Sequence, residues 1–450
     1  METIQGNERL FDVDDVFFST TDTKGVIRGA NNTFITLARH PREEMIGAPH
    51  NIIRHDDMPA GVFKLMWDDL AAGLPVCTYV LNRAGDGLDY WVFATVTAVE
   101  DGYVSVRTKP LDRDAFATVR EIYQRVRAIE RECIAQGLPR RKVAERGAQA
   151  LLAEFEALGY GSLSAFGRAA LPQEAQLLLR AGVRVPVRER SDDAADRILE
   201  LARTIEHDSD TLVGQVGGYR ELLAGLGGWM EQSPAIIRRA RRTGELVAMF
   251  DSQDAESSVP EVSERVSERT ARAVEQLGGL TSTVGALVSA VAQLSFRASL
   301  MRLHTLVLGT YAAAVVDGAE DDVPRAMTEL SHALAEDLAD IGPVCNAIVT
   351  RSDELDELMR SVVSDLDRTR RPFDRWLRAL QNEHASLREG AEGDVLALLG
   401  EAERLSEAGF PEMSALATLA ARCRGLDFSY NSDAMQGTMA AVADAIGDLV

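Results

Sequence analysis

The most regular feature of the chain is a series of apolar residues spaced alternately three and four apart in its last third. One series runs from Leu277 to Val315 and a second from Leu334 to Leu366. This spacing keeps one apolar seam of a helix facing a partner helix, as coiled-coil packing requires. A glycine-containing acidic break at 317–324 separates the two series. The pattern predicts an antiparallel helical hairpin with its tip near residues 314–324.

The long apolar seams also predict how the protein assembles. A hairpin with one apolar seam usually pairs with a second hairpin, so we expect a four-helix bundle formed by a homodimer through this helical region. The uncharged stretch 277–296 contains five serines and threonines, three glycines and Gln293. That composition is too polar for a lipid-exposed helix, and we expect no membrane span.

The first quarter of the chain follows a different pattern. Short β-rich runs alternate with turn residues, and helical spacing appears only after Asn31 and again over 62–70. Two strands, short helices and then three strands joined by tight turns predict an α+β domain with an antiparallel five-stranded sheet. The expected strands are 16–21, 26–30, 77–81, 89–96 and 103–107.

The middle of the chain shows helical spacing without strands. We expect helices over 112–136, 141–157, 172–181 and 191–249, the first with Val119, Ile122, Val126 and Ile129 on its buried face. The expected division is therefore an α+β domain over 1–112, a helical connector over 113–250, and an all-α, coiled-coil or helical-bundle region over 251–450.

Composition narrows the possible functions. The formal net charge is −22, and an acidic surface is repelled by nucleic-acid phosphates and by anionic lipid. The four cysteines stand far apart without metal-ligand spacing, which suits a reducing cytoplasm.

The first 15 residues lack the apolar core of a secretory signal. The chain carries no nucleotide-binding loop, zinc-protease or hydrolase motif, so we expect a cytoplasmic protein that is not an enzyme.

The segment PHNIIRHDDMP at 49–59 is the most distinctive string in the chain. Around it stand Asn31 at a helix start, Phe63 and Trp67 on the following helix, and Asn82 on the third expected strand. Together these residues resemble the FAD-binding PAS sensor domains of the aerotaxis receptors over about 14–110. The resemblance implies FAD as cofactor. It implicates the following positions in binding it or in relaying its redox state: Asn31, His50, Arg54, His55, Asp57, Trp67 and Asn82.

The residue types suit a flavin on chemical grounds as well. An isoalloxazine ring needs an apolar slot, which Phe63 and Trp67 provide, and polar or cationic donors at its pyrimidine edge. Ordinary structural roles stay open: Asn31 as a helix cap, Trp67 and Phe63 as core, and Arg54 as the ion-pair partner of a neighbouring aspartate. The aromatic residue of the receptors before the third strand is Val76 here, which leaves FMN open beside FAD.

Two rival cofactor chemistries involve the same segment. Light-sensing PAS domains form a cysteinyl–flavin adduct, but the helix that holds this signature has no cysteine, and Cys77 lies on an expected strand. Haem-binding PAS domains use an axial histidine, for which His50 and His55 are candidates. A PAS domain without any ligand, acting as a dimerisation scaffold, is the remaining alternative.

The hairpin has a weaker resemblance of its own. Residues 295–304 resemble the tip of chemoreceptor signalling hairpins, but His304, Leu308 and Tyr311 replace the polar residues that contact the chemotaxis kinase and its coupling protein. We therefore expect a cytoplasmic redox or oxygen-status sensor in signal transduction, with weakened contacts to a chemotaxis-type kinase.

Overall fold

The computed structural model describes residues 3–5, 7–189, 193–253, 260–320, 323–385, 393–426 and 430–449. The chain forms two compact units. The first combines Met1–Val213, Ala292–Pro343 and Tyr430–Val450, and the second combines Gly214–Val291 and Val344–Ser429. These units do not coincide with the three consecutive segments expected from the sequence, because three long helices each contribute residues to both.

The first unit contains the sheet. Its strands are β1 (Thr3–Gln5), β2 (Glu8–Leu10), β3 (Phe17–Asp22), β4 (Ile27–Ala30), β5 (Val76–Arg83), β6 (Asp89–Val99) and β7 (Gly102–Thr108). The five expected strands are present, antiparallel, in the order β4-β3-β7-β6-β5. The small β1–β2 hairpin, which the sequence pattern did not indicate, adds to β6.

Short helices cover one face of this sheet: α1 (Asn32–Ala38), α2 (Arg42–Met45), the 3₁₀ turn η1 (His50–Ile53) and α3 (Ala60–Ala71). Phe17 of β3 stacks on Phe34 of α1 at 5.6 Å between ring centroids, inside an apolar core that also holds Ile27, Met45 and Tyr90. The element order and strand order are those of a PAS domain, which confirms the fold expected for this part of the chain.

Three helices follow the sheet: α4 (Arg113–Ala135), α5 (Arg140–Ala157) and α6 (Leu163–Arg180). The expected buried face of α4 is only partly right, because Ile129 is 40% exposed whereas Glu130 is fully buried. Helix α6 begins nine residues earlier than expected and accommodates Pro172 in its second half.

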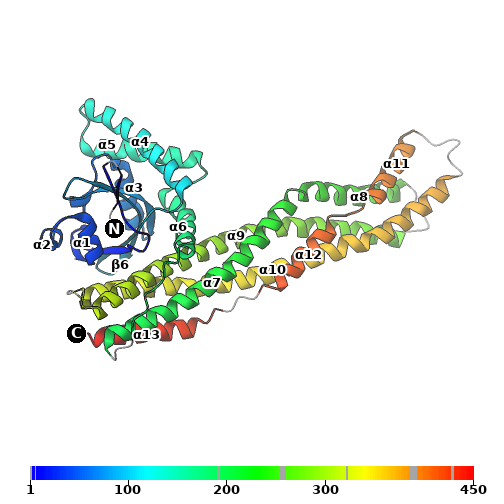
Figure 1. The fold of residues 1–450 in the computed structure, drawn as a ribbon. Helices are drawn as coiled ribbons and strands as arrows, with labels where there is room; N and C mark the ends of the chain where they lie inside the picture. Colours follow the sequence, from blue (N-terminus) through cyan, green and yellow to red (C-terminus); the bar gives the residue numbers. More distant parts are fainter. Residues whose placement is uncertain are drawn as a thin grey trace. The chain divides into compact units, whose positions relative to one another are not determined.

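The remaining helices are long. The segment expected as one helix over 191–249 forms two, α7 (Ala194–Met230) and α8 (Ser233–Gln253). They are followed by α9 (Pro260–Val316) and α10 (Val323–Ala385), then α11 (Gly393–Ala408), α12 (Met413–Arg424) and α13 (Ser432–Gly447). Figure 1 shows α7, α9, α10 and α13 running beside one another in the first unit.

Helices α9 and α10 form the expected antiparallel hairpin. In the first unit, His304 Nδ1 lies 2.7 Å from Asp337 Oδ2, and in the second, Gln276 donates to Ser361 Oγ at 2.8 Å. The seam residues of both series are buried, apart from Val315 at the end of the first. The positions of the seams and of the turn are therefore confirmed.

The seam residues are buried within one chain, and α9 also contacts further helices of that chain. In the first unit, the buried Arg302 of α9 contacts Asp210 of α7. In the second, Val266 of α9 shares an apolar cluster with residues of α8, α10 and α11. Because the seam residues are already buried within one chain, their spacing alone does not require a second copy, and the homodimer stays a prediction.

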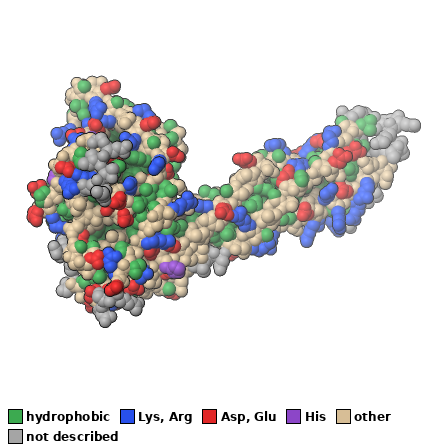
Figure 2. All heavy atoms as spheres, in the orientation of Figure 1, with side chains coloured by type: hydrophobic (Ala, Val, Ile, Leu, Met, Phe, Trp, Pro, Cys, Tyr) green, Lys and Arg blue, Asp and Glu red, His purple; other side chains and the backbone are tan. Residues whose placement is uncertain are grey.

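One helical segment in the described part of the chain, Val262–Val316, is long and apolar enough to cross a membrane by length and composition alone. Core helices of soluble proteins pass the same test. On the face drawn in Figure 2, both units carry acidic as well as basic side chains.

Candidate functional site

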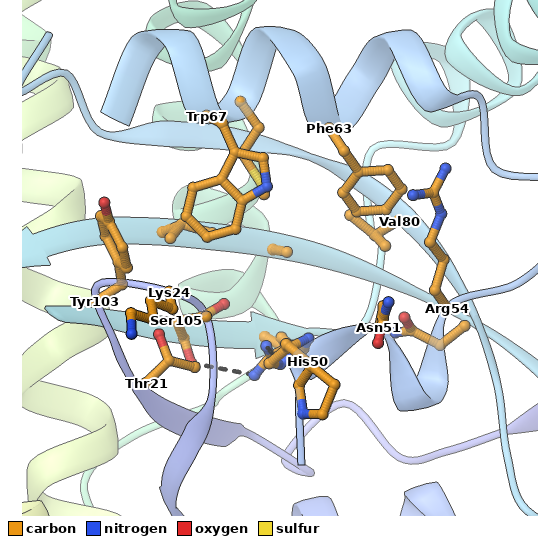
Figure 3. A pocket seen from close by; sticks show the side chains of 17 residues that line it. Thr21, Lys24, His50, Asn51, Arg54, Phe63, Trp67, Val80, Tyr103 and Ser105 are labelled. Carbon is orange, nitrogen blue, oxygen red and sulfur yellow. Dashed lines mark hydrogen bonds between the residues drawn. The ribbon is translucent and has the colours of Figure 1, made fainter. Parts of the chain in front are cut away.

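A cavity of about 330 Å³ lies between the sheet and the helices α3 and η1. Phe63, Met66 and Trp67 of α3 form one wall, because residues three and four apart share one face of a helix. Alternate residues of β5, β6 and β7 form the opposite wall. Figure 3 shows Trp67 and Phe63 facing His50, Ser105 and Thr21 across this space. The strand residues that line it are Val80, Asn82, Ala94, Val96, Tyr103, Ser105 and Arg107.

His50 and Arg107 are joined at the base of the cavity. The Arg107 guanidinium donates to His50 Nε2 at 2.6 Å and to Ser19 Oγ at 3.1 Å. Enclosure of the imidazole and the neighbouring positive charge of Arg107 lower the pKa of His50 to about 3. His50 is therefore neutral at physiological pH, with its proton on Nδ1 because Nε2 accepts a hydrogen bond.

Arg107 is a buried cation without a carboxylate partner. Its residue is only 4% exposed, and no acidic side chain in the described part of the chain forms an ion pair with it. Burial lowers its pKa to about 10, so it keeps its charge at neutral pH. Its guanidinium also lies 4.8 Å from the centre of the Phe34 ring. A buried charge is costly unless it is paired, so this cavity favours an anionic or electron-rich ligand.

Two further polar groups on the cavity wall lack partners. Asn82 Nδ2 and Ser105 Oγ are both buried, and neither has a hydrogen-bond partner among the described residues. Most buried polar side-chain atoms in folded proteins are hydrogen-bonded. Because both residues line the cavity, their free groups are suited to bind a ligand with polar edges.

Arg54 and Trp67 lie at opposite ends of the cavity (Figure 3). The Arg54 guanidinium lies 4.0 Å from the centre of the Phe63 ring and donates to the Met58 carbonyl, so it does not form the ion pair with a neighbouring aspartate that the sequence left open. Burial lowers the pKa of Arg54. Trp67 is 39% exposed and packs edge-on against Tyr103 at 5.4 Å, which makes it a side chain at the rim rather than ordinary core.

Three of the eight predicted site residues lie outside this cavity. Asn31 caps α1: its Oδ1 accepts from the backbone N–H of Phe34 and of Phe18. His55 and Asp57 instead line a second cavity of about 440 Å³, beside Trp91 and α4. The five that the structure brings together are His50, Arg54, Phe63, Trp67 and Asn82.

The prediction missed Arg107 as a site residue. In β7, Val104 and Val106 alternate with Ser105 and Arg107, and such alternation is typical of a strand with one solvated face. The structure covers that polar face with α3 and η1, and both Ser105 and Arg107 are buried. The sequence contained one indication that this face is a polar site: the neighbouring strand β3 also carries a polar residue, Ser19, on the same face.

The residues considered for haem ligation, His50 and His55, and for a cysteinyl–flavin adduct, Cys77, make other contacts. His50 Nε2 accepts from Arg107. His55 Nδ1 accepts from the backbone N–H of Asp57, and its Nε2 contacts Arg83. His55 does not line the first cavity, and the Nε2 atom of His50 is occupied by the contact with Arg107, so neither Nε2 is placed as an axial ligand there. Cys77 does not line the cavity and lies against Gly167 of α6.

Part of the chain is similar in sequence to a known receptor. The chain is 37% identical over 129 residues to the aerotaxis receptor of Escherichia coli (strain K12), a match that covers 28% of this chain and 25% of the receptor. The chain thus matches about a quarter of the length of that relative. No protein-family profile matches the chain.

Solved structures similar to the sheet-containing part are PAS and LOV domains. The PAS domain of a protein from Colwellia psychrerythraea is 17% identical, covering 22% of this chain and 89% of its own, with a TM-score of 0.21. The light-state structure of the blue-light photoreceptor Aureochrome1 LOV is 24% identical, covering 23% and 89%, with a TM-score of 0.21.

Proposed function

We propose that this protein is a cytoplasmic, non-enzymatic sensor in which the PAS cavity binds a flavin, FAD first and FMN as the alternative, and reports its redox state to the helical region. The observation that carries the proposal is the cavity itself, with the unpaired Arg107 cation and the unpartnered Asn82 amide in one apolar slot. The 37% identity to an aerotaxis receptor over 129 residues supports it.

The residues present fit a flavin ring. Phe63, Met66 and Trp67 would hold its apolar faces against Val80 and Ala94, while Asn82, Ser105 and Arg107 would bind its polar edge. A bound flavin supplies reversible electron transfer, with proton uptake at the ring. The volume of about 330 Å³ suits the ring system, and Arg54, at the opposite end from Trp67, is placed to bind a phosphate of the side chain.

The chain's own contribution to redox sensing is electrostatic. Arg107 keeps its positive charge without a carboxylate to neutralise it, so it stabilises negative charge that develops in the cavity. His50 stays neutral and accepts a hydrogen bond from Arg107, which fixes the guanidinium in position. Asn82 offers an amide whose donor and acceptor ends differ, and it is therefore able to distinguish a protonated from an unprotonated ring atom.

Output through a chemotaxis-type kinase is part of the proposal, supported by the similarity to a receptor. The hairpin limits how this contact forms, because Leu300, Leu303, Leu308 and Tyr311 are all buried. A kinase or coupling protein would meet these residues only after the hairpin end is uncovered. We therefore propose weak coupling in the closed state.

A homodimer also belongs to the proposal, supported by the same similarity. The seams alone do not require it, because their residues are already buried within one chain. A dimer would use another surface, and the molar mass of the full chain by light scattering decides this point.

The proposal is tested by the chromophore of the purified full-length chain. We expect a yellow protein that releases FAD on heat denaturation, identified by its mass. A red-brown protein would indicate haem. A colourless protein that takes up neither FAD nor FMN would contradict the flavin proposal and favour a ligand-free PAS scaffold.

A further inference from the structure

The turn between α9 and α10 contacts the PAS domain inside the first unit. Glu320 Oε1 accepts from the backbone N–H of Asn32 at 2.6 Å, and Glu320 Oε2 lies 3.3 Å from Arg42 Nη2. The Asn32 side-chain amide donates to the Ala319 carbonyl. The Glu320 side chain is only 4% exposed. Separating a carboxylate that is buried and paired in this way from its partners is costly, because the separation leaves buried polar groups unpaired.

The contact continues over the sheet face opposite the cavity. Phe18 of β3 packs edge-on against Tyr311 of α9 at 5.2 Å, and both side chains are buried. A side chain at Gly29 of β4 would touch Ala326 of α10. The PAS sheet and the hairpin end thus share an apolar interface, and the polar contacts of Glu320 lie at its edge.

A continuous series of contacts joins this turn to the cavity. The ring of Phe34, on α1, stacks on His50 at 6.0 Å and lies under the Arg107 guanidinium. Phe34 donates its backbone N–H to Asn31, the residue before Asn32. Helix α1 is therefore held by cavity residues at Phe34 and by the hairpin turn at Asn32.

We propose that residues 319–320 form a latch on α1, which holds the end of the α9–α10 hairpin closed against the PAS sheet, and that the charge state of the cavity controls this latch through Phe34. A change of charge beside Arg107 and His50 shifts the ring that both contact, and this shift reaches Asn32 at the start of the same short helix. Opening the latch uncovers the buried end of the hairpin, including Leu303 and Tyr311. The control by the cavity rests on the proposed flavin function, whereas the latch itself does not.

The latch is tested by hydrogen exchange on the full-length chain. Glu320→Gln keeps the shape of the side chain and removes its charge. Since a hydrogen bond to a charged group is worth more than a neutral one, we expect amide exchange over 312–320 and over 30–38 to become about tenfold faster or more. Arg42→Gln should give the same pattern, and the effects of the two changes on the exchange rate should combine to less than their sum, because the two variants share the loss of the Arg42–Glu320 ion pair.

The matched control is Glu401→Gln. Glu401 also pairs with an arginine, Arg242, through two contacts of 2.7 and 2.8 Å, but in the second unit. This variant should leave exchange over 312–320 unchanged. Equal exchange in Glu320→Gln and Glu401→Gln over both segments would overturn the latch.

The second arm compares wild type in air and under dithionite, with flavin content measured by absorbance on the same samples. We expect reduction of a flavin-loaded sample to change exchange over 312–320 and 30–38 together. Unchanged exchange in a sample that carries flavin overturns control by the cavity. A sample without flavin contradicts the proposed function, and the variants still decide the latch.

Discussion

At the scale of single residues, the cavity combines groups that are unfavourable in a protein without a ligand. Arg107 is buried without a carboxylate, and the Asn82 amide is buried without an acceptor. Such groups reduce stability, and they persist where a ligand uses them. Asn31 shows the opposite case: its amide donates to the Val16 carbonyl and caps α1 at Phe34, which is the structural role that the sequence left open for it.

Replacing Asn82 should therefore separate stability from binding. Asn82→Leu removes a buried donor without a partner, so we expect the flavin-free chain to be as stable as wild type or more so. Its flavin affinity should fall about tenfold, because one hydrogen bond is lost. Thr20→Val is the control, since Thr20 Oγ1 is also buried without a partner but does not line the cavity. Equal flavin affinity in Asn82→Leu and wild type, measured by titration, would show that Asn82 does not touch the ligand.

His50 predicts a specific dependence of stability on pH. Its pKa is about 3 in the folded chain and about 6.5 when unfolded, so the unfolded chain binds more protons between these values. Stability must then rise with pH through this window and fall on acidification. Between pH 7 and pH 5 this difference in pKa lowers the free energy of unfolding by about 2 kcal/mol. This value is an upper limit, because the ring faces the cavity.

The His50→Gln variant should lack this part of the pH dependence, whereas the exposed His207→Gln variant should retain it. Denaturant unfolding followed by circular dichroism at both pH values measures the difference. If wild type and His50→Gln lose equal stability on acidification, His50 is not held neutral in the folded chain.

At the scale of elements, helix α3 is fixed tightly at its start. Glu130 of α4 accepts from the backbone N–H groups of Ala60 and Gly61, each at 2.9 Å, and Gly61 packs on the backbone of Gly147 in α5. Since α3 carries Phe63 and Trp67, this contact sets the width of the cavity. The sequence could not show it, because it joins residues about 70 positions apart through a glutamate on a face expected to be polar.

Gly61→Ala should disturb this contact. Its Cβ would lie 2.2 Å from the Gly147 carbonyl carbon, so α3 and α5 must move apart at a cost of about 1–3 kcal/mol. Gly278→Ala, in α9, meets nothing within 4 Å and should instead stabilise by about 0.5–1 kcal/mol. Urea unfolding compares the two, and a Gly61→Ala variant as stable as wild type would contradict the close approach of α3 and α5.

At the scale of the whole molecule, periodicity predicted more than half of the chain. The five PAS strands, the hairpin and the buried seams follow from local spacing, which is set by the geometry of strands and helices. The spacing of the apolar residues in a seam does not show which helix packs against it. Leu287 and Val291 require an apolar partner, and a helix of the same chain satisfies that requirement as well as a second copy does.

Leu287→Asp distinguishes these two cases. Leu287 is fully buried within one chain, whereas its neighbour Val288 is 47% exposed. We expect Leu287→Asp to lower the free energy of unfolding by about 3–5 kcal/mol without changing the molar mass of the folded protein, and Val288→Asp to change stability by about 0.5 kcal/mol or less. A folded Leu287→Asp variant with half the molar mass of wild type in light scattering would restore the seam as a dimer interface.

Whether this cavity holds a flavin is decided by the flavin content per chain when a larger side chain fills the cavity. Ala94→Phe places a large ring in the slot opposite Phe63, whereas Ala98→Leu enlarges a residue on the same strand that does not line it. We expect about one flavin per chain in wild type and in Ala98→Leu, and none in a folded Ala94→Phe variant. Equal flavin content in all three proteins would place the cofactor outside this cavity, and the absence of flavin from all three would show that the chain does not bind one.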